Sequence, residues 1–226
     1  MASYFILVII PLLLSFYVSW KFKSVFDEYS KIPLENYLTG KEVAERMLAE
    51  NNITDVKVVM TDSQLADNYN PGNKTISLSP NVYNSNSIAA AAVAAHECGH
   101  AVQHATKYTW LNFRSAIVPV VSISSRYVMW ILLAGILLVN TLPWLLWLGI
   151  ILFAATVIFS FITLPVEIDA SKRALSWIKT SDTVAINQQS DAARALKWAA
   201  MTYVIAALAS LGTLIYYIMI ATNSRR

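Results

Sequence analysis

Two histidines and a glutamate stand close together near the middle of the chain, in the order His96, Glu97, Cys98, Gly99, His100. Residues four apart on an α-helix lie on one face, one turn apart, so both imidazoles can bind the same metal ion. Zn²⁺ accepts such nitrogens and lowers the pKa of a bound water to about 7. A carboxylate beside the first histidine can then take the proton from that water. The pattern predicts one Zn²⁺ held by His96 and His100, with Glu97 as the general base of a hydrolysis.

The residues around this pattern favour a helix. The alanine-rich stretch that follows Ser87 is a strong helix former, and Ser85 or Ser87 is available as its N-cap. Burying two imidazoles and a carboxylate in an apolar helix is costly unless they have partners, which favours a metal site over ordinary helix residues. Gly99 is expected to allow the close approach of a neighbouring element, such as the strand predicted at residues 74–79.

His104 extends the same helix face by one further turn. Two turns span about 11 Å along a helix axis, too far for one tetrahedral ion to bridge His104 and His96. A position behind the ligands, a substrate contact and a surface position all remain open for it. Cys98 faces away from the histidines and is expected to be a small buried residue.

A catalytic zinc needs a third protein ligand besides the open position for water. The acidic candidates carried close to the end of a membrane helix are Glu167 and Asp169, in the segment Pro165–Ser171. Either carboxylate can supply the ligand, and the alternative for each is a charge at the membrane interface. The segment is expected on the same side of the membrane as the histidines, which favours the ligand role.

The composition indicates a membrane protein. Apolar residues make up 56% of the chain and charged residues 14%, against about 25% charged in soluble domains. The single cysteine excludes an internal disulfide framework. The net charge of +3 is spread along the chain, so no basic stripe for nucleic acid is present. The expected partners are the lipid bilayer and protein or peptide substrates, and nothing in the sequence defines an oligomeric state.

Four transmembrane helices are predicted. Residues 4–20 form an uncharged apolar run, and the alternative of a cleaved signal peptide lacks a basic start and a small-residue cleavage site. The tract 117–164 is too long for one span and is interrupted at residues 140–143, which indicates a helical hairpin. The fourth span lies at about residues 199–221.

Four spans put both termini on one side of the cell membrane and the polar segments 21–115 and 165–198 on the other. Of the 17 lysines and arginines, only Arg225 and Arg226 fall on the terminal side. Because basic residues accumulate on the cytoplasmic side, the polar segments and the active site are expected there.

The predicted fold class is a mainly α integral membrane protein with a small α+β zincin-like domain. That domain contains an amphipathic helix at residues 41–51 and strands at residues 55–60 and 74–79. The predicted divisions are the first transmembrane helix, the cytoplasmic zincin-like domain, the transmembrane hairpin, the third-ligand segment, and the last transmembrane helix with its tail, at residues 1–23, 24–115, 116–164, 165–198 and 199–226.

Two motifs, AVAAHECGHAVQHA at residues 92–105 and LPVEIDASKRAL at residues 164–175, resemble the YugP-like neutral zinc metallopeptidases of bacterial membranes. The resemblance covers nearly the whole chain. More distantly, the chain is similar to the HtpX-type membrane proteases, whose third ligand is the glutamate of an E-x-x-A-D pattern. Glu167 and Ala170 match that pattern. The resemblance implies Glu167 as third ligand and a gluzincin-like, HExxH-containing zinc metalloendopeptidase.

The chain departs from the distant relatives at Ser171, where they carry an aspartate expected to orient a ligand histidine. Asp169 is the candidate to replace it, or the role is absent. For transition-state stabilisation the candidates are Tyr83, Arg173 and Arg194, because each can donate a hydrogen bond. An extended substrate is expected to add as a strand beside residues 74–79.

The main alternative function is a non-enzymatic membrane scaffold with a structural zinc site. A structural site usually closes its fourth position with another protein ligand and has no use for a carboxylate such as Glu97. A transporter or channel would require ionisable groups inside the spans, and the predicted spans contain almost none.

Overall fold

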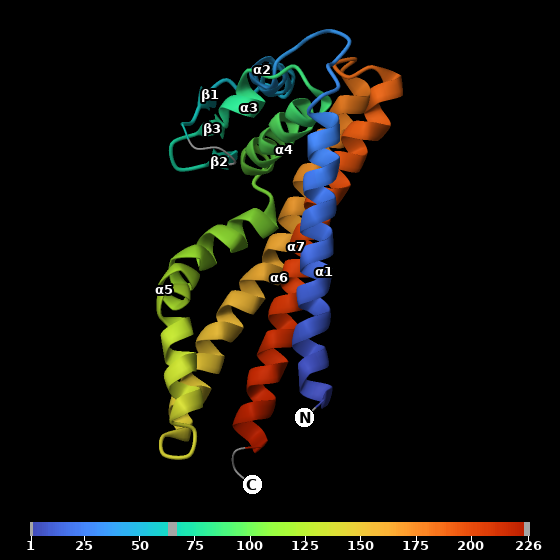
Figure 1. Cartoon of the computed structure of the whole chain (residues 1–226). Coiled ribbons are helices and arrows are strands. Elements are labelled where there is room, and N and C mark those ends of the chain that lie inside the picture. Colours follow the sequence, from blue (N-terminus) through green and yellow to red (C-terminus); the bar gives the residue numbers. More distant parts are fainter. Residues whose placement is uncertain (1, 63–66, 224–226) are drawn as a thin grey trace. The chain divides into compact units, whose positions relative to one another are not determined.

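The computed structural model of the chain describes residues 2–62 and 67–223, and it is mainly helical with one small sheet (Figure 1). This confirms the predicted fold class. The elements in chain order are α1 (Ala2–Tyr29), α2 (Gly40–Glu50), β1 (Lys57–Met60), β2 (Asn68–Asn70), β3 (Thr75–Leu78), α3 (Pro80–Tyr83), α4 (Ile88–Ala105), α5 (Thr109–Leu137), α6 (Pro143–Thr180) and α7 (Ile186–Asn223).

Four of the described helices are long and apolar enough to cross a membrane, as predicted: α1, α5, α6 and α7. They extend well beyond the apolar runs. The predicted turn at residues 140–143 ends where α6 begins at Pro143, and α6 then continues through the third-ligand segment to Thr180. The polar part of α6 is rich in Ala, Lys, Arg and Leu, which are strong helix formers, so the helix does not stop at the end of the apolar run.

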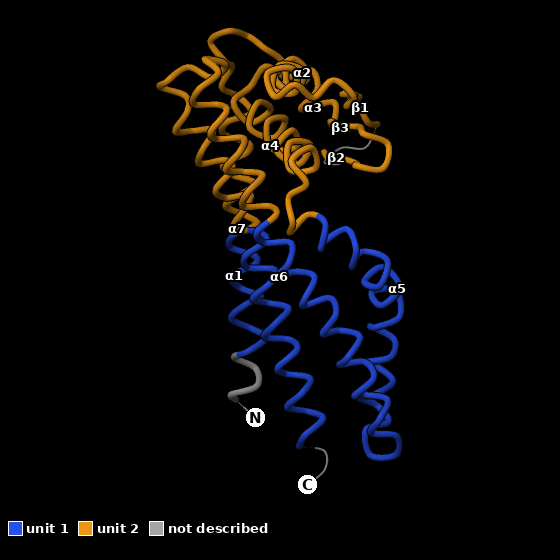
Figure 2. Tube along the Cα trace, turned by 180° about the vertical axis from the view of Figure 1, so that it is seen from behind, with its two compact units in different colours: residues 1–18, 112–165, 202–226 blue, residues 19–111, 166–201 orange. Residues whose placement is uncertain are grey.

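The chain divides into two compact units (Figure 2). Unit 1 comprises residues 1–18, 112–165 and 202–226, and unit 2 comprises residues 19–111 and 166–201. The dividing positions fall inside α1, α5, α6 and α7, so each of these helices contributes to both units. Every residue of the predicted site belongs to unit 2.

Unit 1 has a small apolar core and a large apolar surface. Its core joins α5, α6 and α7 through Val128, Leu132, Leu146, Ile150 and Ala221. A Cβ on Gly135 would lie 2.6 Å from the Leu146 Cα, so α5 and α6 approach closely at that glycine. Large side chains such as Phe16, at 75% exposure, and Trp130, at 70%, point outward. Such exposure suits lipid, since a soluble surface rarely carries so many contiguous apolar groups.

Helix α4 lies at the centre of unit 2. Its side chains from Ile88 to Ala92 are no more than 1% exposed, as are Ala94 and Ala95. The small alanine side chains let α2, α3 and the sheet approach α4. Ser87 caps the helix by accepting a hydrogen bond from the Ala90 backbone N–H, which selects between the two predicted N-caps.

The sheet lies against α4 and has the strand order β1-β3-β2. Strand β3 pairs with β1 in parallel and with β2 in antiparallel, and Ile76 lies opposite both Val58 and Tyr69. Both edges of β3 are therefore occupied, so the expectation that a substrate adds beside residues 74–79 is wrong. Strand β2 was not predicted, because two of its three residues are Asn, which strands disfavour.

Candidate metal centre

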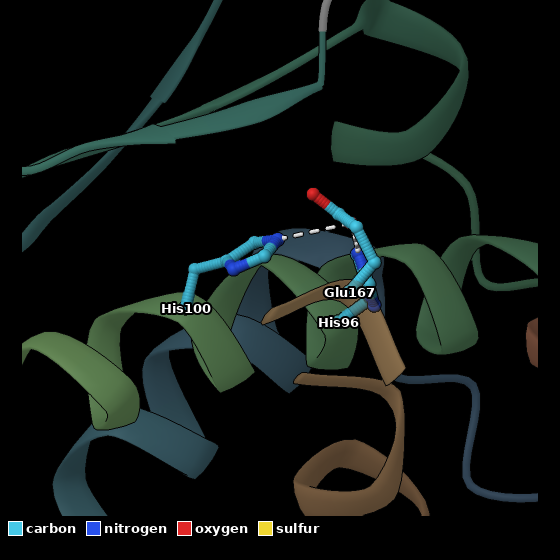
Figure 3. A group of neighbouring side chains, drawn as sticks. All are labelled: His96, His100 and Glu167. Atoms are coloured by element: carbon cyan, nitrogen blue, oxygen red, sulfur yellow. Dashed lines mark hydrogen bonds and ion pairs between the residues drawn. The ribbon is translucent and has the colours of Figure 1, made fainter. Parts of the chain in front are cut away.

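Helices α4 and α6 bring His96, His100 and Glu167 together (Figure 3). The Nε2 atoms of His96 and His100 lie 3.2 Å and 3.5 Å from the same Glu167 Oε2 atom. The candidate ligand atoms all lie within 4.8 Å of one another. Ligand distances of about 2.0–2.2 Å around a tetrahedral zinc place neighbouring ligand atoms about 3.3–3.6 Å apart. The two measured separations agree with that spacing.

Gly99 allows α6 to approach α4 at this point. A Cβ on Gly99 would lie 2.5 Å from the backbone oxygen of Ala170, so the two helix backbones are in direct contact there. The close neighbour of Gly99 is therefore α6, whereas the sequence had suggested the strand at residues 74–79. Ala170 follows Glu167 by three residues, so this contact positions the helical turn that carries the carboxylate.

The Glu167 carboxylate is only 2% exposed, so it requires a positive partner. Burial raises the pKa of Glu167, but the hydrogen bonds and charges of His100 and His96 outweigh burial and hold the pKa well below its usual range. Burial lowers the pKa of His100, but the carboxylates of Glu167 and Glu97 outweigh it and raise this pKa above the usual value. The group is thus arranged to hold positive charge. Two imidazole nitrogens and one carboxylate oxygen are a ligand set that suits Zn²⁺.

Both histidines turn Nε2 toward Glu167 because Nδ1 has a partner on the other side of each ring. His96 Nδ1 lies 3.2 Å from Ser171 Oγ, and His100 Nδ1 lies 3.0 Å from Gln103 Oε1. Ser171 therefore occupies the place of the aspartate found in the distant relatives. The contact with His96 that was considered for Asp169, or considered absent, is made by Ser171 itself.

Asp169 lies outside the ligand group. Its Oδ2 atom accepts hydrogen bonds from Gln103 Nε2 at 2.9 Å and from Arg173 Nε at 2.6 Å. Sequence analysis missed Gln103, although its place three residues after His100 puts it on the neighbouring turn of the same face. The signal available in the sequence was a polar amide one turn after His100 in an otherwise apolar helix.

Glu97 is 8% exposed and follows the first histidine directly. Its negative charge is one of the causes that raise the pKa of His100. In the part of the chain that the structure describes, the Glu97 side chain accepts no hydrogen bond. Its oxygens therefore keep their capacity to accept a proton.

His104 contacts the sheet instead of the ligand group. Its Nδ1 atom lies 2.8 Å from the hydroxyl oxygen of Tyr69 on β2, and the two ring centroids are 5.9 Å apart. This hydrogen bond ties the end of α4 to strand β2. A contact that joins α4 to the sheet was not among the positions left open for His104 by the sequence.

The three candidates for transition-state stabilisation have other contacts. The Tyr83 ring lies 5.6 Å from Lys41 Nζ, and Arg194 Nη1 donates to the Tyr29 hydroxyl at 3.3 Å. Arg173 donates to Asp169 and stacks over the Tyr108 ring at 5.7 Å. These contacts involve neither the two histidines nor Glu167. Among the residues that the structure describes, Arg173 is linked to the group through Asp169 and Gln103.

Comparison with known proteins identifies the family. The model of the family described as "Putative neutral zinc metallopeptidase" matches residues 4–222. The chain belongs to this family. It is also 43% identical over 219 residues to the "Putative membrane protease YugP" of Bacillus subtilis (strain 168), across 97% of this chain and 96% of that protein. No solved structure matches the chain. The predicted family resemblance is thus confirmed, and the chain is a multi-pass membrane member of a zinc metallopeptidase family.

Replacing Gly99 by alanine should separate the ligands. The new Cβ would clash with the Ala170 backbone oxygen, so the α6 turn that carries Glu167 must move away from the histidines. Gly99→Ala is expected to lose most of its zinc, measured by elemental analysis of the purified protein. Gly72→Ala is the control, because a Cβ there meets only the Asn70 side chain, at 3.2 Å. Equal zinc content in the two variants would contradict the packing described.

Proposed function

We propose that the chain is a zinc-dependent membrane endopeptidase, in which His96, His100 and Glu167 hold one Zn²⁺ and Glu97 is the general base. The observation that carries the proposal is the convergence of two imidazole Nε2 atoms and one buried carboxylate, with Glu97 adjacent in sequence to the first histidine. Membership of a zinc metallopeptidase family supports peptide bonds as the target.

Each of these residues has a defined task in peptide hydrolysis. Zinc, when bound, supplies Lewis-acid chemistry by lowering the pKa of water to about 7 and polarising a carbonyl. Glu97 accepts the proton of the attacking water and delivers it to the leaving amine. Glu167 places a negative charge between two imidazoles that are otherwise neutral ligands. Ser171 and Gln103 keep both imidazole rings turned toward that charge.

We also propose that the site faces the cytoplasm. The basic residues that flank the spans lie mainly on the side of the polar segments: Lys21, Lys23, Arg114, Lys172, Arg173 and Lys179. The positive-inside rule assigns that side to the cytoplasm. Substrates would then be cytoplasmic proteins or the cytoplasmic parts of membrane proteins.

Glu97→Gln tests the general base. The amide cannot accept the proton, so cleavage of casein by the detergent-purified protein should fall by about 10²–10⁴-fold. Zinc content should stay at the wild-type level, because Glu97 is not among the three clustered candidate ligands. Fragment masses should show internal cuts, as an endopeptidase requires. If the variant holds zinc and cleaves as fast as wild type, the mechanism is wrong and a structural-zinc scaffold becomes the better description.

Glu167→Gln tests the third ligand. The amide oxygen is a weaker ligand and carries no charge, so zinc content and cleavage should both fall sharply. Asp169→Asn is the matched control, since it makes the same chemical change two residues away at a carboxylate that bonds Gln103 and Arg173. Zinc loss in the Asp169 variant but not in the Glu167 variant would reverse the ligand assignment.

Cysteine labelling tests the topology. In a Cys98→Ala background, Asn73→Cys places a single thiol on an exposed turn of the polar segment, and Asn140→Cys places one in the exposed α5–α6 turn. An impermeant maleimide added to intact cells should label position 140 and leave position 73 unlabelled until the cells are opened. Labelling of position 73 in intact cells would place the site outside.

A further inference from the structure

Gln103 is a fully buried side-chain amide on α4, at 0% exposure. Such an amide has one oxygen that accepts hydrogen bonds and two N–H groups that donate, and burial makes any unpaired atom costly. Every polar atom of Gln103 is used. Oε1 lies 3.0 Å from His100 Nδ1, while Nε2 donates to the Val166 backbone oxygen at 2.7 Å and to Asp169 Oδ2 at 2.9 Å.

The partners of Nε2 determine which way the amide points. The Val166 carbonyl can only accept, and the Asp169 carboxylate, paired with Arg173, also accepts. The nitrogen end of Gln103 must therefore face these two groups, and its oxygen must face His100. Because that oxygen only accepts, the hydrogen between them belongs to His100 Nδ1.

The orientation of the Gln103 amide determines which tautomer His100 adopts. A neutral imidazole with its hydrogen on Nδ1 has its lone pair on Nε2, and His100 Nε2 faces the Glu167 carboxylate. The partner of His96 carries no such information, since the Ser171 hydroxyl can donate or accept. Of these two contacts to Nδ1 atoms, the one from Gln103 specifies a tautomer and the one from Ser171 does not.

The same amide also holds the helical turn that carries Glu167. Its two acceptors, Val166 and Asp169, lie one residue before and two residues after Glu167 on α6. One side chain thus bonds a histidine of α4 and both flanks of the carboxylate on α6. Its loss would release both sides of the candidate metal centre at once.

We propose that Gln103 is a positioning residue of the metal centre: it keeps the hydrogen of His100 on Nδ1, directs Nε2 toward the ion, and holds the turn that carries Glu167. The proposal rests on the proposed zinc site and extends it to a residue outside the three ligands. The Asp169–Arg173 ion pair supports it by presenting an acceptor to the Gln103 nitrogen.

One substitution and a matched control test this role. Gln103→Met removes all three hydrogen bonds at nearly constant volume. Gln188→Met is the control, because Gln188 is also a buried glutamine of unit 2, at 8% exposure. Its Nε2 donates to the Pro33 oxygen at 2.8 Å, and its Oε1 accepts from the Glu35 N–H at 3.4 Å.

Zinc affinity, measured by chelator competition in detergent, should be about 10–100-fold weaker in Gln103→Met than in wild type, as for other residues that orient metal ligands. The visible absorption bands of the Co²⁺-loaded protein should also change in that variant. Gln188→Met should match wild type in both measurements. Unchanged affinity in Gln103→Met, or an equal loss in Gln188→Met, would overturn the proposal.

A second measurement does not depend on any variant folding. Side-chain ¹⁵N spectra of the zinc-loaded wild type should show His100 bound through Nε2 with its hydrogen on Nδ1. Zinc on Nδ1 of His100 would overturn the proposal. If the wild-type chain binds no zinc, both the proposed metal centre and the role of Gln103 are wrong. If the wild-type chain binds zinc and the Gln103→Met or Gln188→Met result is contrary to expectation, only the role of Gln103 is wrong.

Discussion

The burial of one carboxylate is the constraint on which the rest of unit 2 depends. Glu167 is almost completely removed from solvent, and a charge in that position is tolerated only beside positive partners with satisfied hydrogen bonds. His96 and His100 provide those partners from α4. The orientation of the two rings in turn depends on Ser171, which contacts His96 Nδ1, and on Gln103, which contacts His100 Nδ1.

Such an arrangement requires two helices to lie closer than ordinary side chains permit. The alanines of α4 have small side chains and Gly99 has none, so other elements can pack close to the α4 backbone. The sheet and α2 fill the remaining sides. The low side-chain volume of α4 therefore lets α6 approach the two histidines that α4 carries.

Much of this could be predicted from the sequence, for identifiable reasons. The spacing of His96 and His100 predicts a shared helix face, and long apolar runs predict the four spans, because both depend on local periodicity alone. The contact of Gly99 with α6, the short strand β2 and the bonds of Gln103 could not be predicted, because each depends on residues distant in sequence. Tyr83 and Arg194 were chosen only for their ability to donate, and their contacts lie elsewhere.

The order of the candidate ligands along the chain has a consequence for biosynthesis. His96 and His100 precede the α5–α6 hairpin, and Glu167 follows most of its apolar length. The ribosome therefore completes the histidine pair well before it produces the third carboxylate, at about 5–20 residues per second. On the ligand set proposed above, the nascent chain carries an incomplete site during that interval, and the site becomes complete only after the hairpin has been synthesised.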